Sequence, residues 1–385
     1  MKFLHLSDLH IGKIVNGVSM IGEQRHVFEQ IAGYVQTAGP RAVLIAGDIY
    51  DRAVPGVDAV RLFDDFLTEL AGGGTAVLLI AGNHDSPERL NYASRLLSRG
   101  NVFLCGVPGN DGKMRCVTLD DEYGQVNFWL LPFIKPSSLR EYYGDAEIDG
   151  YSDAVRTVIE NSGIDFAARN VLISHQFYTG AGIELVRSES EIDFVGGLDA
   201  VDAGILSRFD YAALGHLHRA QNVGAENIRY GGSPLKYSFS EWRHDKSVTL
   251  VDIGEKGNLK ISALPLTPIH DMREIKGPID GLTSAEVLRE AECEDYMRVI
   301  LTDEGDIADA MGKIRSAYPN VMALDFENSR TGKESGYAGY EAESVENVSI
   351  LDLFSRFFKE IKKTDMSPRQ EKIVRELLEE AGNDK

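Results

Sequence analysis

Cysteine is scarce in this chain, with three residues in 385. Cys105, Cys116 and Cys293 form no C-x-x-C pair, and none of them adjoins the polar clusters described below. This pattern excludes a disulfide framework and a thiolate metal site as the basis of the fold. We expect three reduced thiols that serve as small apolar residues in a cytoplasmic protein.

Long apolar runs are also missing. The longest, such as residues 76–81, are far too short to span a bilayer, and the N-terminal sequence does not resemble a signal peptide. The sequence therefore predicts a cytoplasmic protein that has no membrane segment. A length of 385 residues leaves room for two or three domains.

Positive charge is the third feature in short supply. The chain has 40 Lys and Arg residues against 60 Asp and Glu residues, which gives a formal net charge of −20. This balance excludes a protein coated with nucleic-acid-binding surface. It does not exclude a nucleic-acid enzyme, because divalent cations and a few clustered basic residues can offset the acidity locally. DNA binding by this chain alone should then be weak and strongly salt-dependent.

Polar clusters follow apolar runs at five places, as expected where buried strands end. The five clusters are Asp8-Leu9-His10, Gly47-Asp48, Gly82-Asn83-His84-Asp85, Ser174-His175 and Gly215-His216-Leu217-His218. Any one of them alone is typical of a surface turn. Their repetition along the chain predicts that these side chains converge on one rim of a sheet and bind metal there.

The clusters contain enough ligands for two metal ions. Seven residues supply four imidazoles, two carboxylates and one amide: Asp8, His10, Asp48, Asn83, His175, His216 and His218. Residues i and i+2 of an extended segment project to the same side, so Asp8 and His10 can present two ligands together. The carboxylate of Asp48 has two oxygens and can bridge two cations about 3.5–4 Å apart. This mixed oxygen and nitrogen set favours Mn²⁺, with Fe²⁺, Zn²⁺ or Mg²⁺ as alternatives.

His84 adjoins the candidate ligand Asn83, and we expect its ring to point into the cleft. In that place it would protonate a leaving alkoxide or stabilise charge on phosphoryl oxygens. Asp85 is predicted to fix the tautomer of His84. No side-chain base is needed, because two cations lower the pKa of a water molecule bound between them toward neutral pH.

Hydrophobic patterning divides the chain into four parts, residues 1–267, 268–328, 329–347 and 348–385. In the first part short apolar runs alternate with helix-period segments, which predicts a layered α/β domain of two packed sheets flanked by helices. The second has the pattern of a small α+β unit. The third is rich in Gly, Ser and Glu and predicts a flexible linker.

Two finer predictions concern the parts beyond residue 267. In the α+β unit, strands are expected at 298–301 and 323–326 and a helix within 305–317. The last part contains two predicted amphipathic helices, the second of which begins at the capping sequence Ser367-Pro368-Arg369-Gln370. Their apolar stripes contain Leu351, Phe354, Phe357, Phe358, Ile361, Ile373 and Leu377. Such helices either dock on the parent body or bind a partner, and the pattern alone favours neither.

The order D-x-H, G-D, G-N-H-D, H, G-H-x-H resembles that of the calcineurin-like metallophosphoesterases. Longer strings, above all Gly-Ser-Pro-Leu-Lys-Tyr-Ser-Phe-Ser-Glu at 232–241, are similar to the bacterial SbcD nucleases, the counterparts of archaeal and eukaryotic Mre11. The resemblance implies a four-layer metallophosphoesterase domain of two mixed sheets flanked by helices. A small α+β capping domain and a C-terminal helix pair would follow it.

The same resemblance implies a role for each residue of the clusters. One metal would be held by Asp8, His10, Asp48 and His218, and the other by Asp48, Asn83, His175 and His216. His84 would be the catalytic histidine. Asp51 stands where archaeal members tend to have a second catalytic histidine, and its role is left open.

The resemblance further implies a Mn²⁺-dependent DNA nuclease that works in DNA end processing, replication, repair and recombination. Family activities are 3′→5′ exonuclease on duplex ends and endonuclease on single strands and hairpins. The capping domain would help to hold DNA. The helices at 348–385 would bind SbcC, the Rad50-like ATPase, which fits the absence of a G-x-x-x-x-G-K-[ST] phosphate loop from this sequence. This implication shifts the interpretation of the helix pair toward partner binding.

A homodimer within a heterotetramer is also implied, through segments 57–70 and 87–98. Leu62, Phe66, Leu90 and Leu97 are the candidate contacts there, unless they belong to the core. Six basic residues near the cleft motifs are candidate DNA contacts: Lys13, Arg52, Arg89, Lys236, Arg243 and Lys246.

Two other functions are compatible with parts of the sequence. A metallophosphoesterase acting on small nucleotides or lipid-linked phosphates would need the same ligands, but it would not need the predicted cap or helix pair. A scaffold that kept the fold and lost catalysis would need neither the complete ligand set nor His84. A DNA nuclease accounts for both features.

Overall fold

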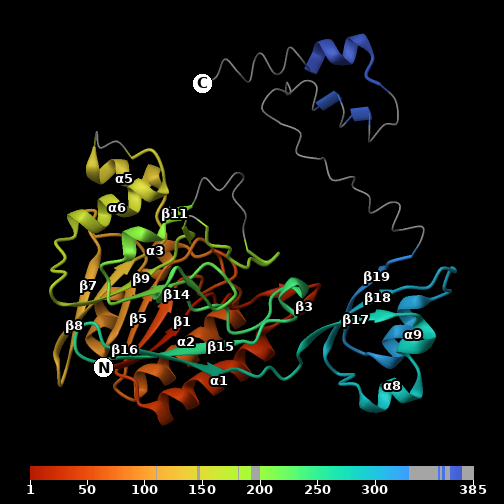
Figure 1. The fold of residues 1–385 in the computed structure, drawn as a ribbon, viewed down its shortest axis with the longest axis horizontal. Coiled ribbons are helices and arrows are strands. Elements are labelled where there is room, and N and C mark those ends of the chain that lie inside the picture. The colour runs from red at the N-terminus through yellow and green to blue at the C-terminus, as the bar shows by residue number, and fades with distance from the viewer. Residues whose placement is uncertain are drawn as a thin grey trace. The chain divides into compact units, whose positions relative to one another are not determined.

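Two six-stranded β-sheets lie at the centre of the unit Met1–Asp325 (Figure 1). The computed structural model describes residues 1–109, 111–144, 148–180, 182–191, 200–328, 354–355, 358–359 and 365–374. A second unit comprises Phe326–Lys385. In the part of the chain that the structure describes, no helix combines the length and the apolar character needed to cross a membrane.

Both sheets are mixed: the first has antiparallel pairing at one edge, and the second has an antiparallel strand at each edge. The first has the order β16 (Leu259–Pro265), β15 (Ser247–Ile253), β1 (Lys2–Leu6), β4 (Ala42–Ala46), β5 (Ala76–Ile80) and β6 (Val102–Cys105). The second has the order β13 (Gln221–Val223), β14 (Ala225–Tyr230), β12 (Tyr211–Leu214), β9 (Arg169–Ser174), β8 (Gly124–Leu131) and β7 (Arg115–Asp121). Strands β1, β4, β5 and β6 are parallel, as are β8, β9, β12 and β14. Parallel strands bring their carboxyl ends to one edge of each sheet.

The strands read as continuous apolar runs because both faces of each sheet are buried. In β4, Leu44 faces the second sheet, whereas Val43 and Ile45 face helices. Between the sheets, the Phe3 ring lies edge-on to the rings of Phe128 and Tyr211, each with a centroid distance of 5.6 Å. The central core is therefore the layer between the two sheets.

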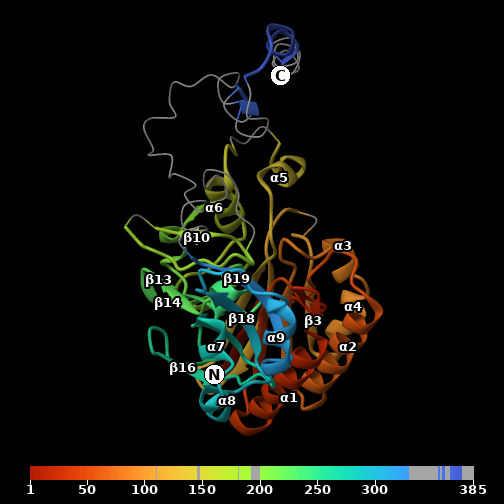
Figure 2. The same cartoon turned by 90° about the vertical axis from the view of Figure 1, so that its right-hand side faces the viewer.

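Helices cover the two outer faces and complete four layers. α1 (Ile21–Ala38) and α2 (Val57–Gly72) pack on the first sheet and lie side by side in Figure 2, with the Phe28 and Phe66 rings stacked at 4.4 Å. α6 (Tyr151–Asn161) covers the second sheet through residues such as Val155. The prediction of two packed mixed sheets flanked by helices is confirmed.

Shorter elements lie in the connections of this domain. They are the hairpin β2 (Ile14–Val15) and β3 (Val18–Ser19), the pair β10 (Tyr178–Thr179) and β11 (Val201–Asp202), the helices α3 (Pro87–Leu90), α4 (Ser94–Leu97) and α5 (Pro136–Tyr143), and the 3₁₀ turns η1 (Ser98–Gly100), η3 (Ala203–Leu206) and η4 (Phe239–Glu241). Several of these connections carry the polar clusters or border them.

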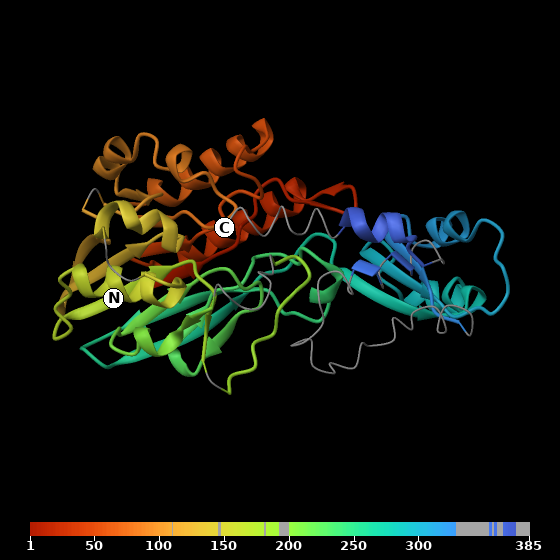
Figure 3. The same ribbon diagram turned by 90° about the horizontal axis from the view of Figure 1, so that it is seen from above.

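A small three-stranded sheet follows and has its own core. Its order is β17 (Met272–Gly277), β18 (Tyr296–Leu301) and β19 (Val321–Phe326), with helices α7 (Ile279–Leu282), α8 (Ala285–Glu290) and α9 (Ala310–Ala317). Val299 and Ile314 are fully buried in this core. Figure 3 shows these residues, cyan to blue, beside the two large sheets. Two of the three strands match the predicted positions, and β17 was not predicted.

A carboxylate on α1 joins the small sheet to the rest of its unit. Glu23 is buried and accepts hydrogen bonds from the backbone N–H of Ile269 at 2.7 Å and from Nδ1 of His270 at 2.7 Å. The Tyr296 hydroxyl of β18 donates to the same carboxylate at 3.3 Å. The boundary between the two domains is therefore tied by directed hydrogen bonds.

The C-terminal stripe is described only in part. Phe354 and Ile373 are 40% and 48% exposed, and Phe358 is half-buried. The capping sequence is present, because the backbone N–H groups of Ser367 and Gln370 each bond the other residue's side chain, at 2.9 and 3.4 Å. The remaining predicted contacts lie outside the described residues: Leu351, Phe357, Ile361 and Leu377.

We predict that the layer between the sheets carries much of the stability. Ile173→Ala in β9, where the side chain is fully buried, should lower the free energy of unfolding by about 2–5 kcal/mol. The matched control is Ile14→Ala in β2, at a residue that is 51% exposed. This substitution should change the free energy of unfolding by less than about 0.5 kcal/mol. Urea denaturation followed by circular dichroism measures both. Equal losses would contradict this assignment of the core.

Candidate metal centre

The polar clusters begin where the parallel strands end. Backbone pairing continues beyond β1 and β4, since the N–H of Asp8 donates to the carbonyl of Gly47 at 3.1 Å and the N–H of His10 to that of Asp48 at 3.0 Å. In the second sheet the N–H of Gly215, after β12, donates to the carbonyl of Ser174 in β9 at 3.0 Å. These pairings fix the backbone of the clusters, so their side chains are held in place before any ligand arrives.

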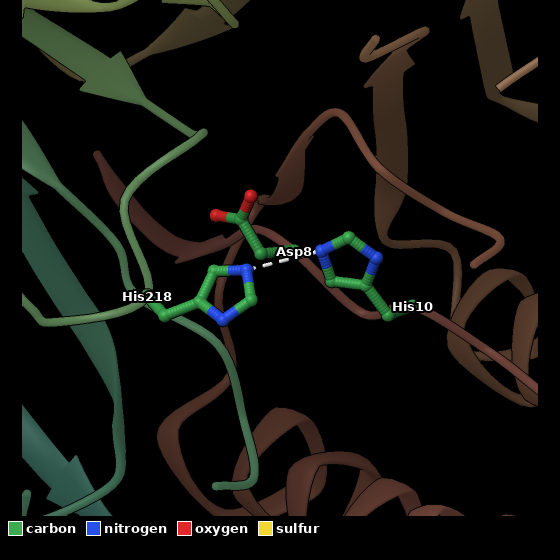
Figure 4. A group of neighbouring side chains, drawn as sticks. All are labelled: Asp8, His10 and His218. Atoms are coloured by element: carbon green, nitrogen blue, oxygen red, sulfur yellow. Dashed lines mark hydrogen bonds between the residues drawn. The ribbon is translucent and has the colours of Figure 1, made fainter. Parts of the chain in front are cut away.

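Three side chains from the two sheets form the first group of the centre. Figure 4 shows Asp8, His10 and His218, which offer ligand atoms that all lie within 4.8 Å of one another. The Nε2 atoms of His10 and His218 face each other at 3.1 Å. All three side chains are buried. Facing imidazole nitrogens beside a carboxylate have the chemistry of a cation site.

Asp48 lies between this group and a second one. Its Oδ2 atom is 3.6 Å from Nε2 of His10 and 3.3 Å from Nε2 of His175. The second group is centred on Asn83, whose Oδ1 lies 3.1 Å from Nε2 of His175 and 3.1 Å from Nδ1 of His216. All seven predicted ligands are therefore brought together. Their donor set of carboxylate, amide and imidazole, without thiolate, fits two divalent cations.

Glycine is required at three points where backbone approaches these ligands. A Cβ atom on Gly82 would lie 2.1 Å from Oδ1 of Asp48, and one on Gly47 would lie 2.3 Å from Nδ1 of His175. A Cβ on Gly215 would lie 1.9 Å from the carbonyl oxygen of Ala46. The glycines inside the clusters thus keep space for the ligands of neighbouring strands.

Four of the candidate ligands have left-handed backbone conformations. The φ angles are 52° at Asp8, 44° at His10, 49° at Asp48 and 103° at His216. A non-glycine residue with positive φ is uncommon, and several in one place indicate that the surrounding structure holds them in a strained arrangement. Such strain is typical of functional sites and favours a role beyond packing.

Electrostatic interactions prepare the centre for positive charge. Burial lowers the pKa of His175, but the carboxylates of Asp48 and Asp8 outweigh burial and raise it to about 9. Burial, together with the charge of His175, lowers the pKa of His216 to about 3. The negative potential that retains a proton on His175 also attracts a divalent cation.

His84 lies at the edge of the centre. Its ring is half-buried and lies edge-on to His10, with a centroid distance of 4.7 Å. Nδ1 of His84 is 3.0 Å from the carbonyl oxygen of Asp51. The prediction that Asp85 fixes the His84 tautomer is therefore wrong, because the Asp51 carbonyl does so. A neighbour in sequence was mistaken for a neighbour in space.

Asp85 supports the centre in another way. Its buried carboxylate accepts hydrogen bonds from the backbone N–H groups of Ile49 at 3.1 Å, Tyr50 at 3.0 Å and Gly82 at 2.9 Å. It therefore ties the loop after β4 to the loop after β5. Burial and the nearby Asp48 charge raise the pKa of Asp85 to about 6 despite these bonds.

Three residues around His218 were not predicted from the sequence. The His218 N–H donates to Oε1 of Glu191 at 2.7 Å, and Ser190 Oγ lies 2.8 Å from His218 Nδ1. Glu241 Oε1 lies 3.3 Å from the same nitrogen. Glu241 belongs to the 232–241 string, which was a signal for it. Ser190 and Glu191 belong to none of the sequence motifs described above.

Two of the six predicted DNA contacts need correction. Lys246 is buried and its Nζ donates to Glu241, Ser233 and the His218 carbonyl at 2.6, 2.8 and 2.9 Å. Lys236 is mostly buried and pairs with Asp271 at 2.7 Å. Their ammonium groups face inward. Lys13 pairs with Asp51 at 2.8 Å, whereas Arg52, Arg89 and Arg243 are exposed.

Most of the predicted dimer contacts also belong to the core. Leu62, Phe66 and Leu90 are 2%, 2% and 7% exposed and pack among helices and the first sheet, so their prediction as dimer contacts is wrong. Leu97 is 36% exposed. Other exposed apolar side chains occur in the same segments: Val57, Val60, Tyr92 and Leu96.

Comparison with known families agrees with this geometry. The model of the calcineurin-like phosphoesterase family matches residues 1–220, which defines the class of protein as a metal-dependent phosphodiesterase. A model described as the type 5 capsule protein repressor C-terminal domain matches residues 268–362. A dimetal phosphatase from Danio rerio has a TM-score of 0.41 at 12% identity, covering 70% of this chain and 99% of that one.

Two curated relatives cover nearly the whole chain. One is the SbcD subunit of the nuclease SbcCD from Staphylococcus saprophyticus, 30% identical over 387 residues and 99% of both chains. The other is the protein of the same name from Staphylococcus epidermidis, 29% identical over 384 residues and 98% of both chains. The chain belongs to the SbcD nuclease family, and the family resemblance found in the sequence is confirmed.

Gly82→Ala should weaken metal binding, because the new Cβ would collide with Asp48. We expect a loss of about 10–100-fold in Mn²⁺ affinity, the range for changes that displace a ligand's support. Gly33→Ala is the matched control, since Gly33 lies within α1 with no atom within 4 Å of its added Cβ. The control should keep its metal affinity and gain about 0.5–1 kcal/mol of stability. Titration calorimetry with Mn²⁺ checks both, and equal affinities would contradict the role of Gly82.

Proposed function

We propose that this chain is the nuclease subunit of an ATP-dependent complex and hydrolyses DNA phosphodiesters with Mn²⁺. The proposed activities are 3′→5′ exonuclease on duplex ends and endonuclease on single strands and hairpins, in the processing of DNA ends in the cytoplasm during replication, repair and recombination. One observation carries the chemistry: six other candidate ligands converge around Asp48, with His84 beside them. The name of the two relatives, which describes them as part of the nuclease SbcCD, supports the substrate.

The proposed ligand assignment follows the two groups of side chains. Asp8, His10, Asp48 and His218 would hold one cation, and Asp48, Asn83, His175 and His216 the other. When bound, two such cations would neutralise charge on the phosphoryl oxygens and lower the pKa of bound water. The position of Asp48 between the two groups suits a bridging carboxylate. Mn²⁺ is favoured because the ligands are oxygen and nitrogen atoms.

His84 is proposed to handle the proton of the leaving oxygen. Its Nδ1–H donates to the Asp51 carbonyl, so the proton that is exchanged with the substrate would be carried by Nε2. The Asp48 Oδ1 atom accepts from the backbone N–H of His84 at 2.9 Å, which holds this residue against the bridging ligand. A fixed tautomer and a fixed backbone are what a positioned general acid requires.

The remaining parts of the chain are assigned to DNA and protein partners. The unit at 268–328 is proposed to help hold DNA, with the exposed Arg52, Arg89 and Arg243 as candidate contacts. The helices at 348–385 are proposed to bind SbcC, the Rad50-like ATPase, across the linker at 329–347. The exposed apolar residues of α2 and of the segment after α3 are proposed to form a homodimer.

A small phosphoester is the competing substrate class, because the centre itself does not distinguish it from DNA. The experiment that separates them compares hairpin, blunt and single-stranded DNA with a small chromogenic phosphodiester, all with Mn²⁺ and with and without the ATPase partner. Cleavage of DNA that exceeds cleavage of the small ester supports the proposal. Hydrolysis of the small ester alone would favour the competitor.

His84→Gln should suppress cleavage but preserve metal binding, because neither proposed ligand set includes this residue, although it lies close to His10 and Asp48. The expected loss in rate is about 10²–10⁴-fold, the usual contribution of a positioned acid. Mn²⁺ content by elemental analysis and single-turnover cleavage of hairpin DNA measure the two effects. His26→Gln, in α1 and outside the centre, should behave as the wild type. Unchanged cleavage by the His84 variant would remove this residue from the reaction.

Deletion of residues 348–385 should abolish association with the ATPase and leave Mn²⁺-dependent cleavage intact. A point variant tests the same surface with less disturbance: Ile373→Glu places a charge on a residue that is 48% exposed. Val287→Glu, on a 41% exposed residue of α8, is the control. Pull-down and sedimentation measure association. Retained binding after the deletion would contradict the assigned role of the helices.

A further inference from the structure

Glu241 is a buried carboxylate that contacts a candidate ligand from behind. It is 0% exposed, and its Oε1 atom lies 3.3 Å from Nδ1 of His218, whose Nε2 faces His10. Ser190 Oγ lies between them, 2.6 Å from Oε1 of Glu241 and 2.8 Å from Nδ1 of His218. A carboxylate in this position keeps a proton on Nδ1 and leaves the Nε2 lone pair for a metal.

Lys246 compensates the charge of Glu241. Its Nζ lies 2.6 Å from Oε2 of Glu241 and is itself buried. An ionised carboxylate without a partner would be costly at this depth, so the lysine allows Glu241 to remain charged beside His218. Lys246 also donates to the His218 carbonyl at 2.9 Å. The three residues form one chain from lysine through carboxylate to imidazole.

A second lysine–carboxylate pair lies behind His10, without a hydrogen bond to the imidazole. Asp51 Oδ1 is 3.7 Å from Nδ1 of His10 and 2.8 Å from Nζ of Lys13. Nδ1 of His10 is buried and has no hydrogen-bond partner among the described residues, and the Asp51 carboxylate faces it at ion-pair distance, beyond that of a hydrogen bond. Asp51 can therefore act on His10 only through its charge.

Among the described residues, the histidines of the second group have no carboxylate behind them. Nδ1 of His175 donates to a neutral backbone carbonyl, that of Ala46, at 2.6 Å. His216 directs Nδ1 toward Asn83, and its Nε2 atom is buried without a hydrogen-bond partner in the described part of the chain. Anionic partners on histidine ligands raise their basicity, and neutral ones do so less.

We propose that the two cation sites are unequal and that the site of Asp8, His10, Asp48 and His218 is the tighter one. The inference rests on the ligand assignment proposed above. Among the described residues, that site alone has lysine-paired carboxylates behind its histidines: Glu241, hydrogen-bonded to His218, and Asp51, at ion-pair distance from His10. Both sites share Asp48, but the first site adds the carboxylate of Asp8, whereas the second adds only the amide oxygen of Asn83. The weaker site is then the one that exchanges its cation with solution and limits activity at low Mn²⁺.

Titration of the full-length protein with Mn²⁺, followed by calorimetry and by the electron paramagnetic resonance signal of free Mn²⁺, tests this inequality. The wild type should bind in two resolved steps. Glu241→Gln removes the charge and should weaken the tighter step by about 10–100-fold while the weaker step stays unchanged. Asp51→Asn should weaken the same step. His216→Ala should remove the weaker step only.

Charge and folding controls accompany these variants. Glu189→Gln makes the same charge change at an exposed neighbour of this region and should leave both steps unchanged. The double variant Glu241→Gln with Lys246→Met leaves no unpaired buried charge, so we expect it to keep the fold. Its tighter Mn²⁺-binding step should still be weakened, as in the single variant. Circular dichroism melting checks the fold of each variant.

Two results would overturn the inference: equal wild-type affinities, or a Glu241→Gln variant that weakens both steps alike. DNA cleavage by the wild type, measured on the same preparation, separates this inference from the proposed function. Unequal binding without DNA cleavage would leave the inference standing and reject the function. DNA cleavage by a protein whose two sites bind Mn²⁺ equally would support the proposed function and overturn the inference.

Discussion

The contact between the two sheets at the ends of β4 and β9 is the constraint on which the centre depends. His175 of the second sheet donates to the carbonyl of Ala46 in the first at 2.6 Å, and Gly47 and Gly215 leave the space for it. This hydrogen bond ties the two rims together beside the packed layer between the sheets. Asp48 can then face histidines from both sheets, because its strand and theirs are held in register by the same contact. The site is therefore a consequence of sheet packing.

Burial of so many polar groups would be costly unless each had a compensating partner. Most of the centre meets this requirement in layers: imidazoles face carboxylates, and the carboxylates behind them face lysines or backbone N–H groups. Nδ1 of His10 and Nε2 of His216 are exceptions, buried without a hydrogen-bond partner among the described residues. Asp85 illustrates the outer layer, with three backbone donors and no ligand contact. A rigid outer layer preorganises the ligands, including the four with left-handed backbone conformations.

The sequence predicts the ligands well and their support poorly, for a physical reason. Asp48 and His175 were found because parallel strands end at one edge, so a polar residue after each strand has a predictable place. Glu241 reaches the centre from the 3₁₀ turn η4, and the 232–241 string that contains it does not indicate which side chain faces His218. The sequence around Lys246 is typical of an exposed segment, yet the side chain of Lys246 points inward and pairs with Glu241. Strand β17 was missed because its exposed, charged residues hide the alternation typical of strands.

The inward lysines also bear on how an acidic protein could attract DNA. With a net charge of −20, the chain repels a polyanion on average. Lys13, Lys236 and Lys246 are engaged with acidic groups, so they contribute little field outside the protein. Local attraction must then come from exposed arginines, from bound cations and from a partner's surface. Cations held by the proposed ligands would add positive potential at the centre itself.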